Sequence, residues 1–206
     1  MKYPCTGVIL AGGTNSRLPG PKKTFHSVGG EPMLMRLYRL FDRLFEKTLI
    51  VVNDPRDFVE LDIEVVTDII PLRCALAGLH AGLFYSAHPY AYVSACDVPF
   101  ASEAVIRHAM ELIRPGTQVV IPRTPDGTEP LSAVYSRECI PLIERNLEKR
   151  IFMIKRFFKP NRVREIPPET LKKLDPKMQF MFNVNTPADL KTAESMAVDQ
   201  SKNKEQ

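Results

Sequence analysis

Near its start the chain reads Thr6-Gly7-Val8-Ile9-Leu10-Ala11-Gly12-Gly13, a short apolar run that passes directly into a pair of glycines. A run of this length with a glycine boundary predicts a buried strand. Further strands are predicted from similar runs at residues 48–52, 64–67 and 90–95. Helical spacing of apolar side chains predicts helices between them, at residues 33–44, 75–86 and 102–113. Strands that alternate with helices in this way predict a parallel sheet covered by helices on both faces.

The second half of the chain has a less regular pattern. Strands are predicted at residues 118–122 and 131–135, with a Pro-Asp-Gly turn between them. Helices are predicted at residues 138–147, 151–158 and 188–197, and a basic stretch interrupted by prolines occupies residues 159–168. Thr186 is the predicted N-cap of the last helix, with Pro187 at its first position. Since no repeat or long linker divides the chain, we expect one domain over residues 1–198 and a frayed tail over residues 199–206.

Composition limits the classes of partner. The chain has 206 residues, of which 44% are hydrophobic and 25% charged, and this suits a globular domain. Its formal net charge of +4 suits an anionic ligand but is too small and too spread to indicate nucleic acid. The four cysteines form no C-x-x-C pair, which argues against a zinc site. With no leader-like start and no apolar run near 18 residues, we expect a cytoplasmic protein without a membrane partner.

A glycine-rich, basic loop follows the first predicted strand. Gly12 and Gly13 let the backbone approach a ligand closely, and Arg17, Lys22 and Lys23 add three cations with no acid among them. Ligands of open parallel sheets bind beyond the carboxyl ends of the strands, so this loop predicts a polyphosphate site. The loop matches neither the ATPase G-x-x-x-x-G-K-[ST] motif nor the dinucleotide G-x-G-x-x-G motif. The alternative is an ordinary glycine turn with solvated cations.

Polar residues also close the other predicted strands. Asp97 directly follows the strand at residues 90–95, where a carboxylate facing the glycine loop can hold Mg²⁺ against phosphates. An aspartate that caps a turn before Pro99 is the alternative. Asn53 and Asp68 end two further strands on the same side, and ordinary Asx turns explain them equally well.

Five motifs resemble those of the molybdenum cofactor guanylyltransferases. They are L-A-G-G-x-x-S-R-L-x-G-x-x-K from Leu10 to Lys23, L-A-G ending at Gly78, C-D-x-P at Asp97, P-L-x-A-x-Y from Pro130 to Tyr135 and N-x-N-T-P-x-D-L from Asn183. The resemblance runs from Thr6 to Leu190 and is weakest over residues 159–179. It implies an α/β three-layer sandwich with a Rossmann-like, mostly parallel sheet, of the nucleotide-diphospho-sugar transferase type.

The resemblance also implies roles for single residues. It makes Arg17, Lys23 and Asp97 catalytic. Nucleotide contacts are implied for Leu10, Ala11, Gly12, Gly13, Lys23, Asn53, Asp68, Gly78 and Asp97. Metal ligands are implied at Asp97 and Asn185, then Asn183, because an amide oxygen is a suitable ligand of a hard cation. The acceptor is expected beside Pro130 and Tyr135. Arg150, one of the cations between residues 145 and 164, is a candidate contact of its phosphate, and a solvated helix face is the alternative explanation of these cations. Lys22 departs from the family, which usually has an acid before the lysine, and Cys74-Ala75 replaces its Gly-Pro.

The implied function is Mg²⁺-dependent transfer of GMP from GTP to the phosphate of molybdopterin, which forms the guanine dinucleotide cofactor and pyrophosphate. The resemblance also implies molybdoenzyme apoproteins or other cofactor-biosynthesis proteins as partners. Without a recognisable Ser-His-Asp or Cys-His arrangement, we expect direct in-line attack on the α-phosphorus. Two rivals share the fold: a cytidylyltransferase for molybdopterin and a sugar-1-phosphate nucleotidylyltransferase. A third, a non-catalytic nucleotide-binding partner protein, would lack the metal carboxylate, and Asp97 is present.

Overall fold

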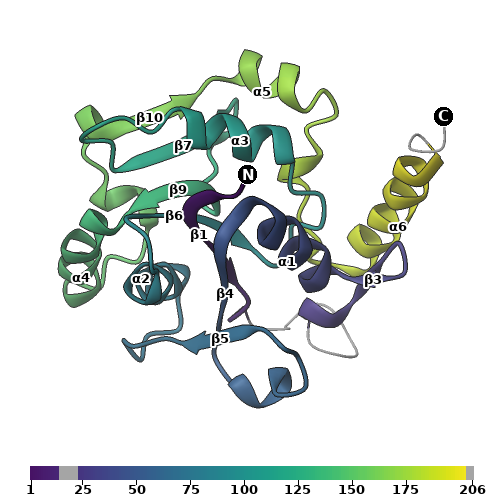
Figure 1. The fold of residues 1–206 in the computed structure, drawn as a ribbon, viewed down its shortest axis with the longest axis horizontal. Helices are drawn as coiled ribbons and strands as arrows, with labels where there is room; N and C mark the ends of the chain where they lie inside the picture. The colour runs from purple at the N-terminus through teal and green to yellow at the C-terminus, as the bar shows by residue number, and fades with distance from the viewer. Residues whose placement is uncertain (14–22, 203–206) are drawn as a thin grey trace.

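The computed structural model describes residues 1–13 and 23–202, and a mostly parallel sheet forms its centre (Figure 1). The strands lie in the order β10-β7-β9-β6-β1-β4-β5. Their bounds are β1 Tyr3–Leu10, β4 Phe45–Val52, β5 Glu64–Thr67, β6 Tyr90–Ala95, β7 Val119–Thr124, β9 Ser132–Ser136 and β10 Val163–Ile166. Strand β9 is antiparallel to both of its neighbours, and the other pairs along this order are parallel. The predicted α/β class is confirmed.

Helices cover both faces of the sheet, because successive strand residues point to opposite sides. The helices are α1 Met33–Leu44, α2 Ala75–Tyr85, α3 Glu103–Glu111, α4 Ile140–Glu148, α5 Pro168–Leu174 and α6 Pro187–Lys202. Val8 of β1 packs in one core cluster with residues of α2 and α4, which lie side by side in Figure 1. Its neighbour Ile9 packs in a second cluster with residues of α1, α3 and α5. The result is the expected three-layer arrangement.

The parallel strands bring their carboxyl ends to one edge of the sheet. Leu10, Val52, Thr67 and Ala95 end β1, β4, β5 and β6 there. Strand β9 begins at this edge, since Ser132 pairs with Ser94 near the end of β6. We call this the carboxyl edge; the loops that leave it are the ones that can meet a ligand.

The stretch between α4 and α6 differs from the sequence prediction. Residues 151–158 do not form the expected helix, and only a 3-10 turn occupies Ile154–Phe157. Ile154 and Phe157 are buried in the α2–α4 cluster, so their packing fixes the chain where helical spacing was inferred. Strand β10 and helix α5, which were not predicted, follow in the proline-interrupted stretch. β10 exists because it pairs with β7, a contact that local sequence does not reveal.

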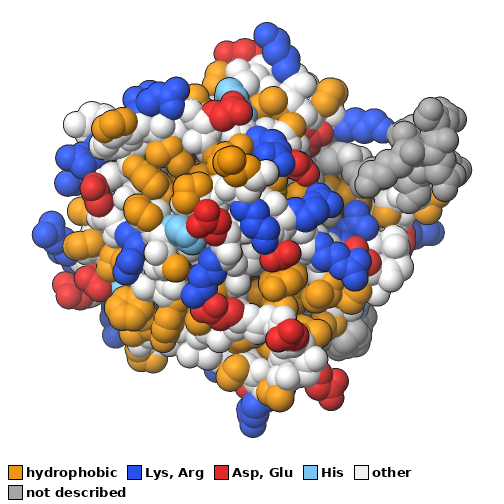
Figure 2. All heavy atoms as spheres, viewed as in Figure 1, with side chains coloured by type: hydrophobic (Ala, Val, Ile, Leu, Met, Phe, Trp, Pro, Cys, Tyr) orange, Lys and Arg blue, Asp and Glu red, His pale blue; other side chains and the backbone are white. Residues whose placement is uncertain are grey.

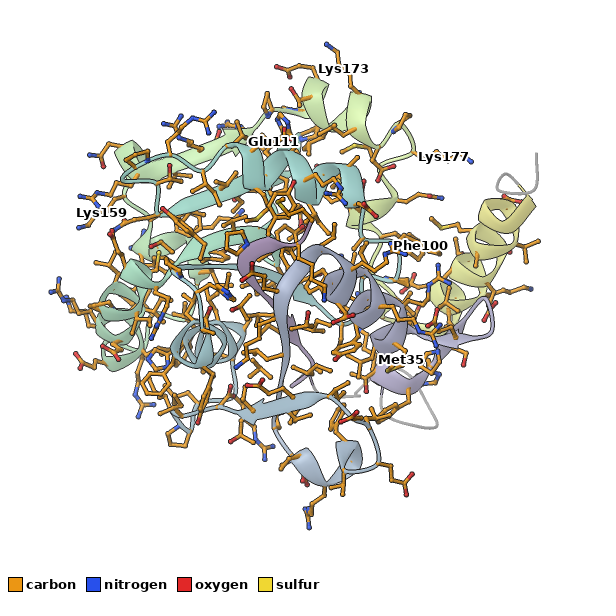
Figure 3. All side chains as sticks on the ribbon, in the orientation of Figure 1. Met35, Phe100, Glu111, Lys159, Lys173 and Lys177 are labelled. Atoms are coloured by element: carbon orange, nitrogen blue, oxygen red, sulfur yellow. The ribbon has the colours of Figure 1, made fainter. Side chains whose placement is uncertain are left out.

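Helix α6 continues to Lys202, beyond residue 198, where the sequence suggested a tail. Ala193 and Ala197 are buried against Val28 and Phe100, which form a small third core cluster. Val28 belongs to β2 (Ser27–Val28), which pairs with β3 (Glu31–Pro32), and Figure 3 shows Phe100 between the sheet and α6. Residues 203–206 lie outside the described part of the chain.

Acidic and basic side chains are interspersed over the face shown in Figure 2. Within residues 1–13 and 23–202, no helix combines the length and apolar character needed to cross a membrane.

Candidate active site

A cavity of about 620 Å³ opens at the carboxyl edge. Its volume is in the range of small-molecule and cofactor sites. The walls come from the loop after β1, the ends of β4, β5 and β6, the start of α2 and the start of β9. The lining residues are Leu10, Ala11, Gly12, Gly13, Lys23, Thr24, Val51, Val52, Asn53, Asp54, Phe58, Asp68, Arg73, Cys74, Ala75, Gly78, Ala95, Cys96, Asp97 and Leu131. All nine residues for which the sequence predicts nucleotide contacts are among them.

The end of β4 holds the glycine loop in place. The Ala11 amide donates to the Val51 carbonyl at 2.8 Å, and the Asn53 side-chain amide donates to the Gly12 carbonyl. A Cβ added at Gly12 would lie only 2.7 Å from the Asn53 Oδ1 atom, whereas one added at Gly13 would meet nothing within 4 Å. A Cβ at position 12 would therefore force the Asn53 side chain to move from its bond with the Gly12 carbonyl, whereas position 13 faces open space.

Lys23, Asp97 and Asn185 converge beside this loop. The Lys23 ammonium donates to Asp97 Oδ2 at 2.6 Å and to Asn185 Oδ1 at 2.5 Å. The side chains of Lys23 and Asp97 are only 16% and 21% exposed. Lys23 starts a 3-10 helix (Lys23–Phe25), Asp97 lies just after β6 and Asn185 lies just before α6. A carboxylate oxygen and an amide oxygen thus point at one cationic position.

The segment that carries Asn185 is fixed by its own capping. The Thr186 hydroxyl accepts from the Asp189 amide at 3.2 Å, which confirms Thr186 as the cap of α6. In return, Asp189 Oδ2 accepts from the amides of Asn185 at 2.9 Å and Thr186 at 2.8 Å. These bonds, first that from the Asn185 amide, lower the pKa of the Asp189 carboxyl. Asn183 points elsewhere, because its side-chain amide donates to the Met181 carbonyl at 3.2 Å.

Asp68 presents an unsatisfied carboxylate to the cavity. Its Oδ1 atom is buried and has no hydrogen-bond partner among the described residues. Burial raises the pKa of this carboxyl, and the charge of His80 opposes the rise. A Cβ at Gly78 would stand at ordinary contact distance, 3.5 Å from Leu10 Cδ2 and 3.8 Å from Asp68 Oδ1. A ligand group that donates a hydrogen bond to Asp68 Oδ1 would satisfy this atom, since a buried acceptor without a partner is costly.

The residues predicted at the acceptor are not brought into the cavity. Tyr135 is completely buried, and its hydroxyl donates to the Pro130 carbonyl at 2.7 Å. Burial raises the pKa of Tyr135 well above its usual value. Tyr135 thus anchors the turn before Leu131, which does line the cavity. Arg150 is exposed at the end of α4, outside the cavity lining. Arg17 and Lys22 lie outside the described residues.

Several lining residues were missed by the sequence analysis. Phe58 ends a 3-10 helix (Pro55–Phe58) that Asp54 caps through a bond from the Arg56 amide at 3.1 Å. The Phe58 side chain is buried. The available signal in the sequence was a single aromatic residue in the polar segment after the strand. Arg73 and Cys74 enter the cavity because they precede α2 at the carboxyl edge, where no motif marked them.

Known proteins have a similar sequence and architecture. The family model for the MobA-like NTP transferase domain matches residues 7–164. A molybdenum cofactor guanylyltransferase of Desulfosudis oleivorans is 38% identical over 92% of this chain and 94% of that protein. A probable molybdenum cofactor guanylyltransferase of Pelotomaculum thermopropionicum is 36% identical over 93% of each chain.

A solved structure agrees with these relatives. Molybdopterin-guanine dinucleotide biosynthesis protein A of Archaeoglobus fulgidus has a TM-score of 0.82 and 28% identity, and the match covers 94% of this chain and 99% of that one. The family match over residues 7–164 includes Gly12, Gly13, Lys23 and Asp97. The chain belongs to the MobA-like NTP transferase family.

Proposed function

We propose that this protein transfers GMP from GTP to the phosphate of molybdopterin and releases pyrophosphate, with Mg²⁺ as its metal. The observation that carries the proposal is the convergence of Lys23, Asp97 and Asn185 beside the glycine loop. One cation and two oxygen atoms that meet beside a cavity of this size suit the triphosphate of a nucleotide. The names of the relatives at 38% and 36% identity support molybdopterin as the acceptor.

The residues at this position fit a magnesium ion. Asp97 Oδ2 and Asn185 Oδ1 both accept hydrogen bonds from the Lys23 ammonium. The two oxygen atoms therefore already face one positive charge, as they would face a metal ion. The described residues hold no group of three or more His, Cys, Asp and Glu side chains suited to a metal. A hard ion that takes few protein ligands and completes its coordination with phosphate oxygens matches this set. When bound, Mg²⁺ would offset charge on the α-phosphate and on the leaving pyrophosphate.

The protein's own groups do the rest by placement and charge. Gly12 and Gly13 hold the backbone close to the phosphates. When the nucleotide binds, the Lys23 ammonium leaves the Asp97 carboxylate and contacts the phosphates. Arg17, in the undescribed part of the loop, adds a second cation. An oxygen of the acceptor phosphate then attacks the α-phosphorus in line, the bond from that phosphorus to the bridging oxygen breaks, and pyrophosphate leaves with that oxygen. No side chain needs to form a covalent intermediate.

Asp68 supports guanine as the base. Guanine carries neighbouring N–H donors on N1 and N2, and a carboxylate accepts both, whereas cytosine presents acceptors beside its single amino group. Asp68 lines the cavity, and its Oδ1 atom has no hydrogen-bond partner among the described residues, which makes this carboxylate the candidate acceptor for both donors. Asn53 contributes by fixing the loop that meets the nucleotide.

The acceptor would bind on the β9 side of the cavity. Pro130 is held there by Tyr135, which acts through this bond and not by direct contact. Arg150 is the proposed partner of the acceptor phosphate. Transfer of the finished cofactor to molybdoenzyme apoproteins or other cofactor-biosynthesis proteins, and a cytoplasmic site of action where GTP is available, belong to the same proposal.

A product assay tests the proposal. The protein is incubated with Mg²⁺, one labelled nucleoside triphosphate and either molybdopterin or a hexose 1-phosphate, and pyrophosphate release is measured. Among these combinations, we expect pyrophosphate release only for GTP with molybdopterin. Release with CTP would replace guanine by cytosine, and reaction of a hexose 1-phosphate would replace the acceptor. Tight GTP binding without release for any acceptor would indicate a non-catalytic binding protein.

A further inference from the structure

A basic loop with two exposed apolar side chains follows α4. Residues 149–156 read Lys-Arg-Ile-Phe-Met-Ile-Lys-Arg, with two cations on each side of the apolar run. Phe152 is 42% and Met153 63% exposed, while Ile154 is buried and anchors the segment. We call residues 149–156 the basic loop. Neighbouring exposed apolar side chains framed by cations suit a ligand that has both a flat ring and a negative charge.

The basic loop lies at the carboxyl edge. Helix α4 starts at the opposite edge, where the Arg137 amide just before it donates to the carbonyl of Pro89, the residue that precedes β6. The helix then runs back across the sheet. At its far end, Lys155 Nζ would be 3.2 Å from a Cβ added at Gly127, in the turn that follows β7. Strand β7 runs parallel to β6, because both are antiparallel to β9, so this turn and the cavity share one edge.

The backbone at Arg150 supports a role for its side chain. Arg150 has φ 55°, in the left-handed region that favours glycine. Its amide donates to the Leu147 carbonyl at 2.9 Å and the Ile151 amide to Asn146 at 2.8 Å, the Schellman pattern that usually has glycine at this position. Arginine is unfavourable there, and no partner within the described part of the chain offsets its cost. Strain kept at one residue of a binding edge points to function.

We infer that the basic loop is the acceptor-binding surface, with Phe152 and Met153 against the heterocyclic ring and Arg150 and Lys155 at the phosphate. The inference rests on the proposed function and names the residues that hold its second substrate. The occupant is a phosphate-bearing heterocycle because the loop carries only positive charge and shares its edge with the nucleotide cavity. An acidic partner protein would also suit the charge, and the kinetic test separates the two.

Phe152→Ser is the first test, with Phe84→Ser as its matched control. Phe84 is 50% exposed at the end of α2, and its carbonyl accepts from Arg137 at the opposite edge. We expect Phe152→Ser to raise the KM for molybdopterin about tenfold, with the Kd of GTP from calorimetry unchanged. Phe84→Ser should change neither. An unchanged acceptor KM in Phe152→Ser would overturn the inference and leave a partner protein as the occupant.

Arg150→Gly separates binding from structure. Glycine suits the left-handed backbone, so the thermal midpoint should hold or rise, yet the acceptor KM should rise about tenfold and the salt dependence of KM should weaken. A higher midpoint with an unaltered KM would show a purely structural position and refute the role of Arg150. Pyrophosphate release by the wild-type protein is measured first. Its absence refutes the proposed function, whereas release by the wild type with normal KM values in both variants refutes the basic loop alone.

Discussion

The Val184 amide donates a hydrogen bond to the main-chain carbonyl of Asp97 at 2.9 Å. This bond ties the segment before α6 to the end of β6, so the next residue, Asn185, reaches the position that Asp97 faces. Val184 is itself completely buried in the third core cluster, which adds apolar packing to the polar link. Asp97, which follows β6, and Asn185, which precedes α6, are therefore held together by backbone and core contacts.

Asp97→Asn is expected to lower kcat by about 10²–10³-fold. The amide keeps the shape of the side chain but removes the negative charge that pairs with the Lys23 ammonium and would hold the metal. Steady-state pyrophosphate release measures the loss. GTP affinity in the presence of EDTA should remain near that of the wild type. A variant with normal turnover would show that Asp97 has no part in the reaction.

Asn185→Ala and Asn183→Ala form a matched pair on one exposed segment. Only Asn185 reaches the cation beside Asp97, whereas Asn183 turns to Met181. We expect the Mg²⁺ concentration for half-maximal activity to rise about tenfold for Asn185→Ala and to stay constant for Asn183→Ala. Equal effects in the two variants, from a magnesium titration of initial rates, would contradict the placement of Asn185 in the metal site.

Asp68→Asn tests the base pocket. Loss of the carboxylate should weaken GTP binding by about 1–3 kcal/mol and narrow the preference for GTP over CTP, as measured by calorimetry. Because burial raises the pKa of Asp68, the wild type should lose GTP affinity on acidification before an ordinary aspartate protonates, and the variant should not. Parallel pH profiles for the two proteins would exclude Asp68 from base recognition.

The same variant has an effect on stability with a defined sign. The folded pKa of Asp68 lies above the unfolded one, so its contribution to stability is fully present below the unfolded pKa and is lost as pH rises through the folded pKa. At pH 7, Asp68→Asn should therefore raise the free energy of unfolding. This gain in unfolding free energy should shrink toward pH 3, where the wild-type carboxyl is protonated and therefore uncharged, like the amide. Urea unfolding at both pH values provides the measurement.

Gly12→Ala and Gly13→Ala differ in what the new methyl group meets. The Cβ at position 12 approaches Asn53 to 2.7 Å, and we expect the free energy of unfolding to fall by about 1–3 kcal/mol. Position 13 opens to space, so the unfolding free energy should change by less than about 0.5 kcal/mol. Thermal and urea unfolding compare them. A neutral Gly12→Ala would mean that the loop can shift away from Asn53 without cost.

Local pattern alone determined the strands that end at the cavity. A buried apolar run followed by glycines, and another followed by Asp97, predict strands with functional loops, because a strand's end and the next residue are fixed by neighbouring sequence. The bounds of α1 and β6 were predicted to the residue. The motif within one loop also identified Gly12, Gly13 and Lys23, which line the cavity, since their spacing is set by a short piece of chain.

Contacts between distant segments decided the rest. Residues 151–158 have helical spacing of apolar side chains but form no α-helix, because burial of Ile154 and Phe157 fixes this segment. Strand β10 forms because it pairs with β7. The choice of Asn185 over Asn183, the burial of Tyr135 and the length of α6 likewise depend on what packs against each segment. Sequence specifies periodicity and turns, whereas the direction of a side chain and the exclusion of water around it follow from the assembled core.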